Sequence, residues 1–190
     1  SRTESGILLL VDLEKRINDP AFRLLANEVL AEASSPSHWL VFEAMSELSD
    51  PEDALSVTRL VAQGDASPEL RAKALERLVK RPDMKNRTSQ EDLGRWTEGT
   101  WNLYVAKPEL ASSSSPAEMF LTLLLEEDIP GGKAVLTRIS TDNVPAPYKM
   151  SFLNTLHYAT TDVPGKPAAC RFAVDETLAF VEPLLRDGDP

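Results

Sequence analysis

The stretch Asp19-Pro20-Ala21-Phe22-Arg23, which continues to Leu30, is matched later by Ser67-Pro68-Glu69-Leu70-Arg71, which continues to Leu78. In both stretches Pro is followed by an apolar residue at +2, Arg at +3, Ala at +6, Glu at +8 and Leu at +10. Pro after a polar residue is typical of the first turn of a helix, and the later spacing is helical. The repetition predicts stacked α-helical hairpins, because a repeated unit that cannot bury its own apolar face is stabilised by its neighbours.

Apolar residues recur at helical spacing along the whole chain, in segments separated by Pro, Gly and Ser. Leu, Ala and Glu are abundant and β-branched runs are scarce, which favours helix over strand. We therefore expect about ten helices, and short turns between them favour antiparallel neighbours. The expected apolar stripes run over 10–17, 22–33, 41–48, 54–61, 72–79, 93–104, 119–125, 135–139, 148–159 and 174–185. Pro183 is expected to kink or end the last helix.

The two Pro-x-x-Arg phrases resemble the second-helix pattern of the HEAT family, in which an Asp-Pro turn precedes an Arg and a small residue on a packed helix. The resemblance covers about 24 of the 190 residues directly. It implies an all-α fold, a right-handed stack of antiparallel helical hairpins known as an α-solenoid. Such solenoids commonly bind other proteins, and the resemblance carries over no catalytic residue.

The chain is long enough to bury one continuous core, so the sequence predicts a single domain over 1–190. Its 42% hydrophobic and 26% charged residues are close to globular averages. The only low-complexity stretch is the serine run 112–115, which Pro116 follows. A possible internal boundary therefore lies near 107–116.

The formal net charge of −10 argues against sequence-independent binding to nucleic acid, which needs a positive surface. Residues 71–87 nevertheless carry a net charge of +5, against −15 for the remainder. Within that segment Lys73, Arg77, Lys80 and Arg81 recur at i, i+4, i+7 and i+8, so they form a basic ridge opposite the apolar stripe of one helix. The ridge is either a solvated face or a docking site for an acidic partner or nucleic acid.

Trp96, Trp101 and Tyr104 form the densest aromatic group in a chain with three tryptophans. Exposed Trp and Tyr anchor many interfaces, whereas the same residues at helical spacing also fill cores. The group is a binding-site candidate if it is half exposed and core packing otherwise.

No pattern in the sequence predicts catalysis, a metal site or a cofactor. The two histidines, His38 and His157, are far apart and have no His or Cys partner at helical spacing, and Cys170 is the only cysteine. The turn Pro130-Gly131-Gly132-Lys133 lacks the spacing of a phosphate-binding loop. No apolar run is long enough to span a membrane. The lone cysteine favours a reducing compartment such as the cytoplasm, and the missing initiator Met leaves an upstream signal or anchor open.

These observations favour a non-enzymatic scaffold or adaptor that binds another protein on a curved helical surface. The first alternative is a small helical enzyme or ligand-binding domain, which a closed apolar pocket lined by His157, Tyr158 and several acids would support. The second is binding of nucleic acid or an acidic partner through the basic segment 71–87. The sequence leaves the oligomeric state open.

Overall fold

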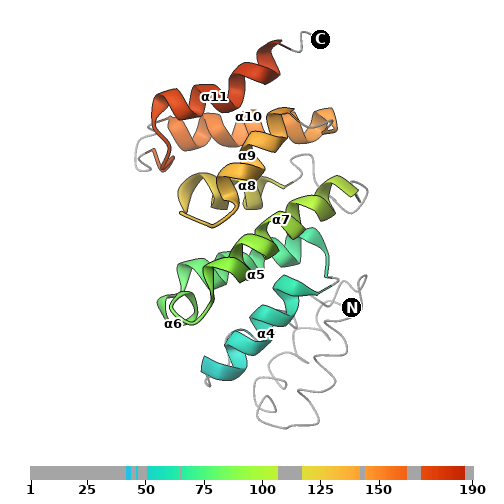
Figure 1. The fold of residues 1–190 in the computed structure, drawn as a ribbon, viewed down its shortest axis with the longest axis vertical. Helices are drawn as coiled ribbons and strands as arrows, with labels where there is room; N and C mark the ends of the chain where they lie inside the picture. Colours follow the sequence, from blue (N-terminus) through green and yellow to red (C-terminus); the bar gives the residue numbers. More distant parts are fainter. Residues whose placement is uncertain are drawn as a thin grey trace, which may run out of the picture. The chain divides into compact units, whose positions relative to one another are not determined.

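The structure is a computed structural model whose described part is all-helical. It describes residues 42, 43, 46, 51–64, 66–106, 117–141, 144–161 and 168–186. Eight helices and no strand occur in these residues (Figure 1). The expected stripes over 10–17 and 22–33 lie outside the described residues, as does most of 41–48. None of the described helices is long and apolar enough to cross a membrane.

The chain divides into two compact units, Ser1–Arg87 and Thr88–Pro190. The division falls before α7, whereas the sequence placed its candidate boundary near 107–116. Residues 107–116 lie outside the part of the chain that the structure describes.

The first unit contains α4 (Pro51–Gln63), α5 (Pro68–Lys80) and the short α6 (Pro82–Lys85). The helix α5 is the one that the second Pro-x-x-Arg phrase predicts, and its start follows local chemistry. Pro68 stands in the first turn, where its missing N–H costs nothing, and the hydroxyl of Ser67 accepts a hydrogen bond from the Leu70 N–H at 3.3 Å. This prediction is confirmed. The helix α6 lies between the stripes expected over 72–79 and 93–104, where the sequence predicted no helix.

The helices α4 and α5 pack against each other, and their facing side chains form the core of this unit. Arg71 of α5 donates from Nε to the carbonyl oxygen of Ala62, 3.1 Å away near the C-terminal end of α4. That carbonyl is one of the last four of its helix, which lack a partner in an intact helical ladder. The arginine of the second phrase therefore ties α5 to the end of α4.

The second unit contains the five remaining helices of the described chain. They are α7 (Gln90–Ala106), α8 (Glu118–Glu126), α9 (Gly132–Thr141), α10 (Ala146–Thr160) and α11 (Val174–Arg186). Alternate helices are in contact: α8 packs on α10, α9 packs on α11 and α7 packs on α9. Pro183 does not end α11, which continues to Arg186.

The core of the second unit gathers around α8, whose sequence is apolar on almost every side. Five of its nine residues are buried, and its neighbours are α9 and α10. The helix α8 covers the apolar stripe expected over 119–125. Tyr148 of α10 lies beside it with its ring against Trp101 and Tyr104, and its hydroxyl donates to the Tyr104 carbonyl oxygen at 3.0 Å. The same carbonyl belongs to the last turn of α7.

Candidate functional site

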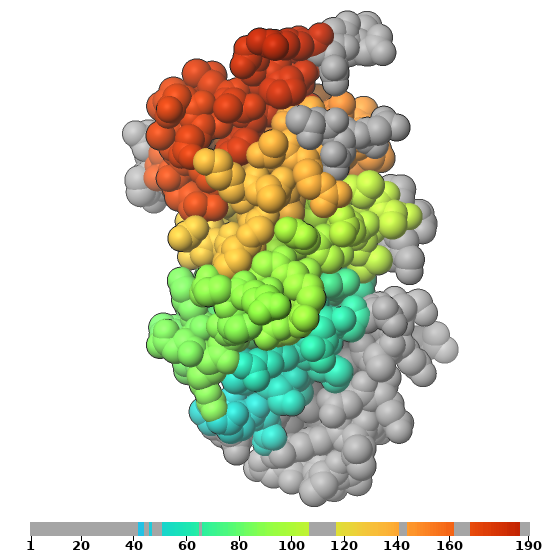
Figure 2. Space-filling model, viewed as in Figure 1, coloured from blue at the N-terminus to red at the C-terminus, as the bar shows by residue number. Residues whose placement is uncertain are grey.

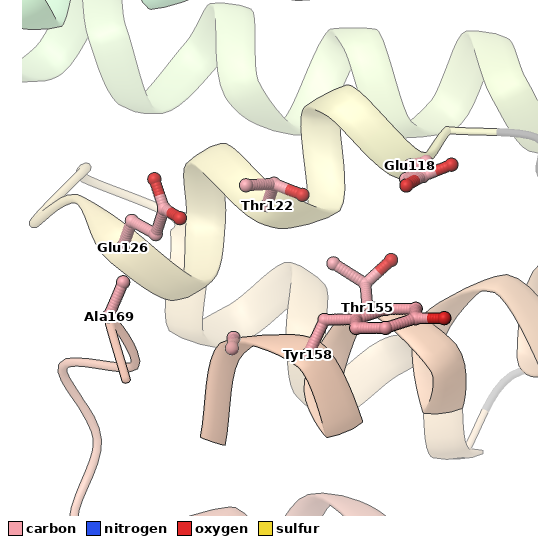
Figure 3. Close-up of a pocket in the computed structure, with 7 residues that line it drawn as sticks. Glu118, Thr122, Glu126, Thr155, Tyr158 and Ala169 are labelled. Carbon is pink, nitrogen blue, oxygen red and sulfur yellow. The ribbon is translucent and has the colours of Figure 1, made fainter. Parts of the chain in front are cut away.

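A pocket of about 400 Å³ lies between α8 and α10 in the second unit. Figure 3 shows Glu118, Thr122 and Glu126 in a row along α8, with Thr155 and Tyr158 of α10 on the facing side. The row follows from the helix period, since residues at i, i+4 and i+8 share a face. Ala159 and Ala169 complete the lining. The volume is in the range of small-molecule sites, about 300–1,000 Å³.

The segment 168–171 closes one end of this pocket by bonding to the C-terminal turns of both helices. The N–H groups of Ala169 and Cys170 each donate to the Ala159 carbonyl oxygen at 3.0 Å, and the Arg171 N–H donates to the Leu125 carbonyl oxygen at 2.9 Å. These carbonyls lie in last helical turns, where no intrahelical N–H reaches them. The pocket wall at Ala169 is therefore fixed by backbone groups from α8 and α10 together.

The described lining of the pocket combines acidic, hydroxyl-bearing and small apolar side chains. Its seven residues include two carboxylates, and none of these seven is basic. The Thr155 hydroxyl donates its hydrogen to the Ser151 carbonyl oxygen at 2.7 Å. Toward a ligand this hydroxyl can therefore act only as a hydrogen-bond acceptor. The Tyr158 side chain is 65% exposed, so its ring is accessible from solvent. Among the described residues no group of three or more His, Cys, Asp or Glu side chains is placed to hold a metal ion.

A second feature is the apolar face of α11, formed by Val174, Leu178, Val181 and Leu185. The sequence predicts these four as one stripe, at i, i+4, i+7 and i+11. Val174, Leu178 and Leu185 are 77%, 62% and 73% exposed, and Val181 is half-buried. In the space-filling view α11, coloured red, forms part of the visible surface (Figure 2). We call these four residues the α11 stripe.

The opposite side of α11 holds the helix on its unit. Phe180 is buried and meets the Phe172 ring edge to face, with centroids 5.1 Å apart. Glu176 pairs with Lys133 of α9 at 2.6 Å, and this hydrogen bond lowers the pKa of the Glu176 carboxyl below its ordinary value. At 100° per residue, Phe180 lies about 130° and Glu176 about 170° around the helix from the middle of the stripe, so fixing these two side chains turns the stripe outward.

The aromatic binding candidates Trp96, Trp101 and Tyr104 are buried, with exposed fractions of 4%, 0% and 1%. Trp101 and Tyr104 meet the Tyr148 ring edge to face, and Tyr104 also lies against Phe120 at 5.8 Å between centroids. Trp101 and Tyr104 pack in the core of the second unit, and Trp96 is buried, so core packing is the alternative that holds among those the sequence left open. The three rings therefore do not form a surface anchor in this conformation.

The expected basic ridge does not form one solvated face, which corrects the sequence-based prediction. Arg77 has a side chain only 10% exposed, pairs with Glu43 and places its guanidinium 5.4 Å from the centre of the Phe42 ring. Arg81 donates to the Ser46 carbonyl oxygen at 3.0 Å. The physical reason is that Leu70 and Ala74, which neighbour Arg77 on α5, are themselves buried, so α5 is covered on more than one side.

Carboxylates neutralise the ridge further. Glu76 pairs with both Lys73, at 2.7 Å, and Lys80, at 3.3 Å, and Asp83 pairs with Arg81 at 2.9 Å. Burial raises the pKa of Glu76, but hydrogen bonds and charge from its two lysines outweigh this and hold the pKa below its ordinary value. All four ridge residues thus have acidic partners inside the protein, which disfavours a nucleic-acid surface here.

The sequence analysis missed the row of pocket residues on α8 and its pairing with residues of α10. The pocket residues Glu118, Thr122 and Glu126 follow helical spacing, but three polar residues on one face normally signal a solvated surface. The facing residues of α10 are about 30 positions away, so only packing brings the two rows together. His157, which the sequence paired with Tyr158 in a hypothetical pocket, is exposed and does not line this one.

No protein-family model matches the chain, and no similar curated protein or solved structure was found.

Proposed function

We propose that this chain is a non-enzymatic, HEAT-like helical domain that binds another protein, and that the α11 stripe is its docking face. The observation that supports this most is the exposure of Val174, Leu178 and Leu185 on a single helix face. Full burial of each such side chain stabilises a complex by about 1.5–3 kcal/mol, so leaving all three in water is costly unless a partner covers them.

Packing between alternate helices supports a stack of hairpins. In such a stack each hairpin lies on the next, so the first helix of one contacts the first helix of the following one. The contacts of α8 with α10 and of α9 with α11 follow this pattern. A right-handed superhelix with a curved binding surface is the corresponding proposal for the whole fold.

The proposed occupant is an amphipathic helix of a partner protein, with basic residues beside its apolar face. Asp175 and Glu182 follow the α11 stripe along one edge, where Glu182 also pairs with Arg186, and the chain carries a net charge of −10. A second copy would bring the same acidic edge and the same net charge to the interface, whereas a cationic helix would complement both. Apolar positions at i, i+3, i+4 and i+7 of the partner would fit the stripe.

The test uses two synthetic helical peptides with the same leucine stripe, one with lysine and one with glutamate flanks, and measures binding by fluorescence anisotropy. The lysine peptide should bind more tightly. A Leu178→Glu/Leu185→Glu variant should bind it at least about tenfold more weakly, because the stripe loses its apolar contact. Met150→Glu, at an exposed apolar residue of α10, is the matched control and should bind as the wild type does.

Since the stripe variant adds negative charge, weaker binding of a cationic peptide cannot come from lost charge attraction. Equal affinity of both peptides, or of the stripe variant and the wild type, would contradict the proposal. So would a wild-type dimer in sedimentation that Leu178→Glu/Leu185→Glu dissociates, because the occupant would then be a second copy. A photo-reactive group at position 178 should cross-link the natural partner within a basic, helical segment.

A further inference from the structure

We infer that α11 is a detachable helix, which leaves the second unit and unfolds by itself while α7 to α10 stay folded. The latch that holds it consists of the Phe172–Phe180 ring pair and the Lys133–Glu176 ion pair. This inference goes beyond the proposed docking function, because it concerns how α11 is attached and holds whether or not a partner binds the α11 stripe.

The helix α11 buries very little of its own surface. Of its thirteen residues, all of which the structure describes, Phe180 alone is buried, whereas α8 buries five of nine and α10 buries six of fifteen. Burial of apolar surface is the main favourable contribution to the docking of a helix. Loss of α11 therefore costs the unit much less than loss of α8 or α10 would.

The two contacts of the latch differ in strength. The rings of Phe180 and Phe172 meet edge to face with centroids 5.1 Å apart, and Arg171 places its guanidinium 4.0 Å from the centre of the Phe172 ring. The ion pair joins Lys133 and Glu176 at 2.6 Å, but these side chains are 62% and 40% exposed. Exposed ion pairs contribute little to stability, so the ring pair is the main attachment of α11.

Pro183 weakens the helix from within. Proline has no N–H to donate to the carbonyl oxygen four residues earlier, which belongs to Ala179, and its ring crowds that carbonyl. An isolated helix of about 12–15 residues is at best marginally stable in water. The helical structure of α11 therefore depends on its docking, so detachment and unfolding occur together.

Detachment removes the α11 stripe as an apolar face. The four stripe residues share one side only while the segment is helical, because their alignment depends on the helix period. A change that opens the latch therefore switches the stripe off without unfolding α7 to α10. Local opening of weakly held elements is the usual origin of such switches in folded proteins.

Amide hydrogen exchange of the full chain, followed by mass spectrometry of peptides from each helix, tests the inference. Protection factors in α11 should be at least about a hundredfold lower than in α8 and α10. Phe180→Ala should lower the protection of α11 at least about tenfold further and leave that of α8 and α10 unchanged. Leu178→Ala, the matched control, shortens an exposed side chain of the same helix and should stay within about threefold of the wild type.

Pro183→Ala gives an independent test, because it restores a helical N–H without altering either ring of the pair. It should raise the protection of α11 at least about tenfold. Equal protection of α11 and α8 in the wild type would overturn the inference. Loss of protection in α8 and α10 together with α11 in Phe180→Ala would do the same, since α11 would then unfold only with the whole unit.

Two further results would contradict the latch itself. Equal losses of α11 protection in Leu178→Ala and Phe180→Ala would show that the ring pair is not the main attachment. An unchanged α11 in Pro183→Ala would show that the proline does not weaken the helix. Since exchange is measured without any peptide, each of these outcomes is independent of the docking experiment.

Discussion

Replacing Tyr148 by Phe should destabilise the second unit, because it removes the hydroxyl that bonds to the Tyr104 carbonyl. This carbonyl lies in the last turn of α7, and the residue four positions later is Pro108, which has no N–H to continue the helix. The Tyr148 hydroxyl donates to it at 3.0 Å in a buried setting. The substitution keeps the ring of residue 148, so its packing against Trp101 and Tyr104 is retained.

The expected loss is about 1–3 kcal/mol, the cost of leaving a buried acceptor unsatisfied. With a urea m-value of about 2 kcal/mol/M, a loss of 2 kcal/mol lowers the unfolding midpoint by about 1 M. The assay is tryptophan fluorescence in a Trp39→Phe background, in which both remaining tryptophans lie in the second unit.

Tyr158→Phe is the matched control, because it removes the same hydroxyl from a side chain that is 65% exposed. Its midpoint should correspond to a change of less than about 0.5 kcal/mol. If Tyr148→Phe is equally harmless, the bond to the Tyr104 carbonyl does not hold α7 to α10 and the reasoning is refuted.

Three further predictions concern the turn before α9 and the charges of α5. Gly131→Ala should cost about 1–2 kcal/mol in urea unfolding, because Gly131 has φ +77°, whereas Gly132→Ala should cost much less. Arg77→Ala should lower the free energy of unfolding by about 1–3 kcal/mol, because it removes the contacts with the Glu43 carboxylate and the Phe42 ring. Lys80→Ala should change it by less than about 0.5 kcal/mol. Equal effects of the two variants would indicate that Arg77 and Lys80 lie on one solvated face. The pKa of Glu76 lies below its ordinary 4.5, so its ion pairs stabilise the fold above that pH and are lost as the pH falls through the lower folded value. The urea midpoint of Glu76→Gln should therefore fall less than that of the wild type between about pH 5 and about pH 3, and parallel curves would contradict this.

The helices could be predicted from the sequence because their signals are local. Ser67 and Pro68 start α5 where the pattern places it, and the spacing of Leu93, Trp96 and Thr100 anticipates α7 in spite of two glycines. The short α6 was missed, since four residues give too few periods to distinguish a helix from a turn.

The candidate site was much less predictable. The pocket joins a row of polar residues on α8 to residues of α10 about 30 positions away, and spacing within one helix carries no information about the other. The burial of Arg77 in the basic ridge could not be predicted for the same reason. It depends on Phe42 and Glu43, which precede Arg77 by more than 30 residues.

The sequence by itself determined that the chain is helical, where most described helices begin and which of their faces are apolar. Tertiary structure decided which apolar faces are covered. Val57 and Val61 of α4 are buried, whereas Val174 and Leu178 of α11 have the same helical spacing and are exposed. Helical spacing depends on neighbours within one or two turns, but burial depends on whether a distant segment packs on that face, so only the folded chain distinguishes a core stripe from an exposed stripe.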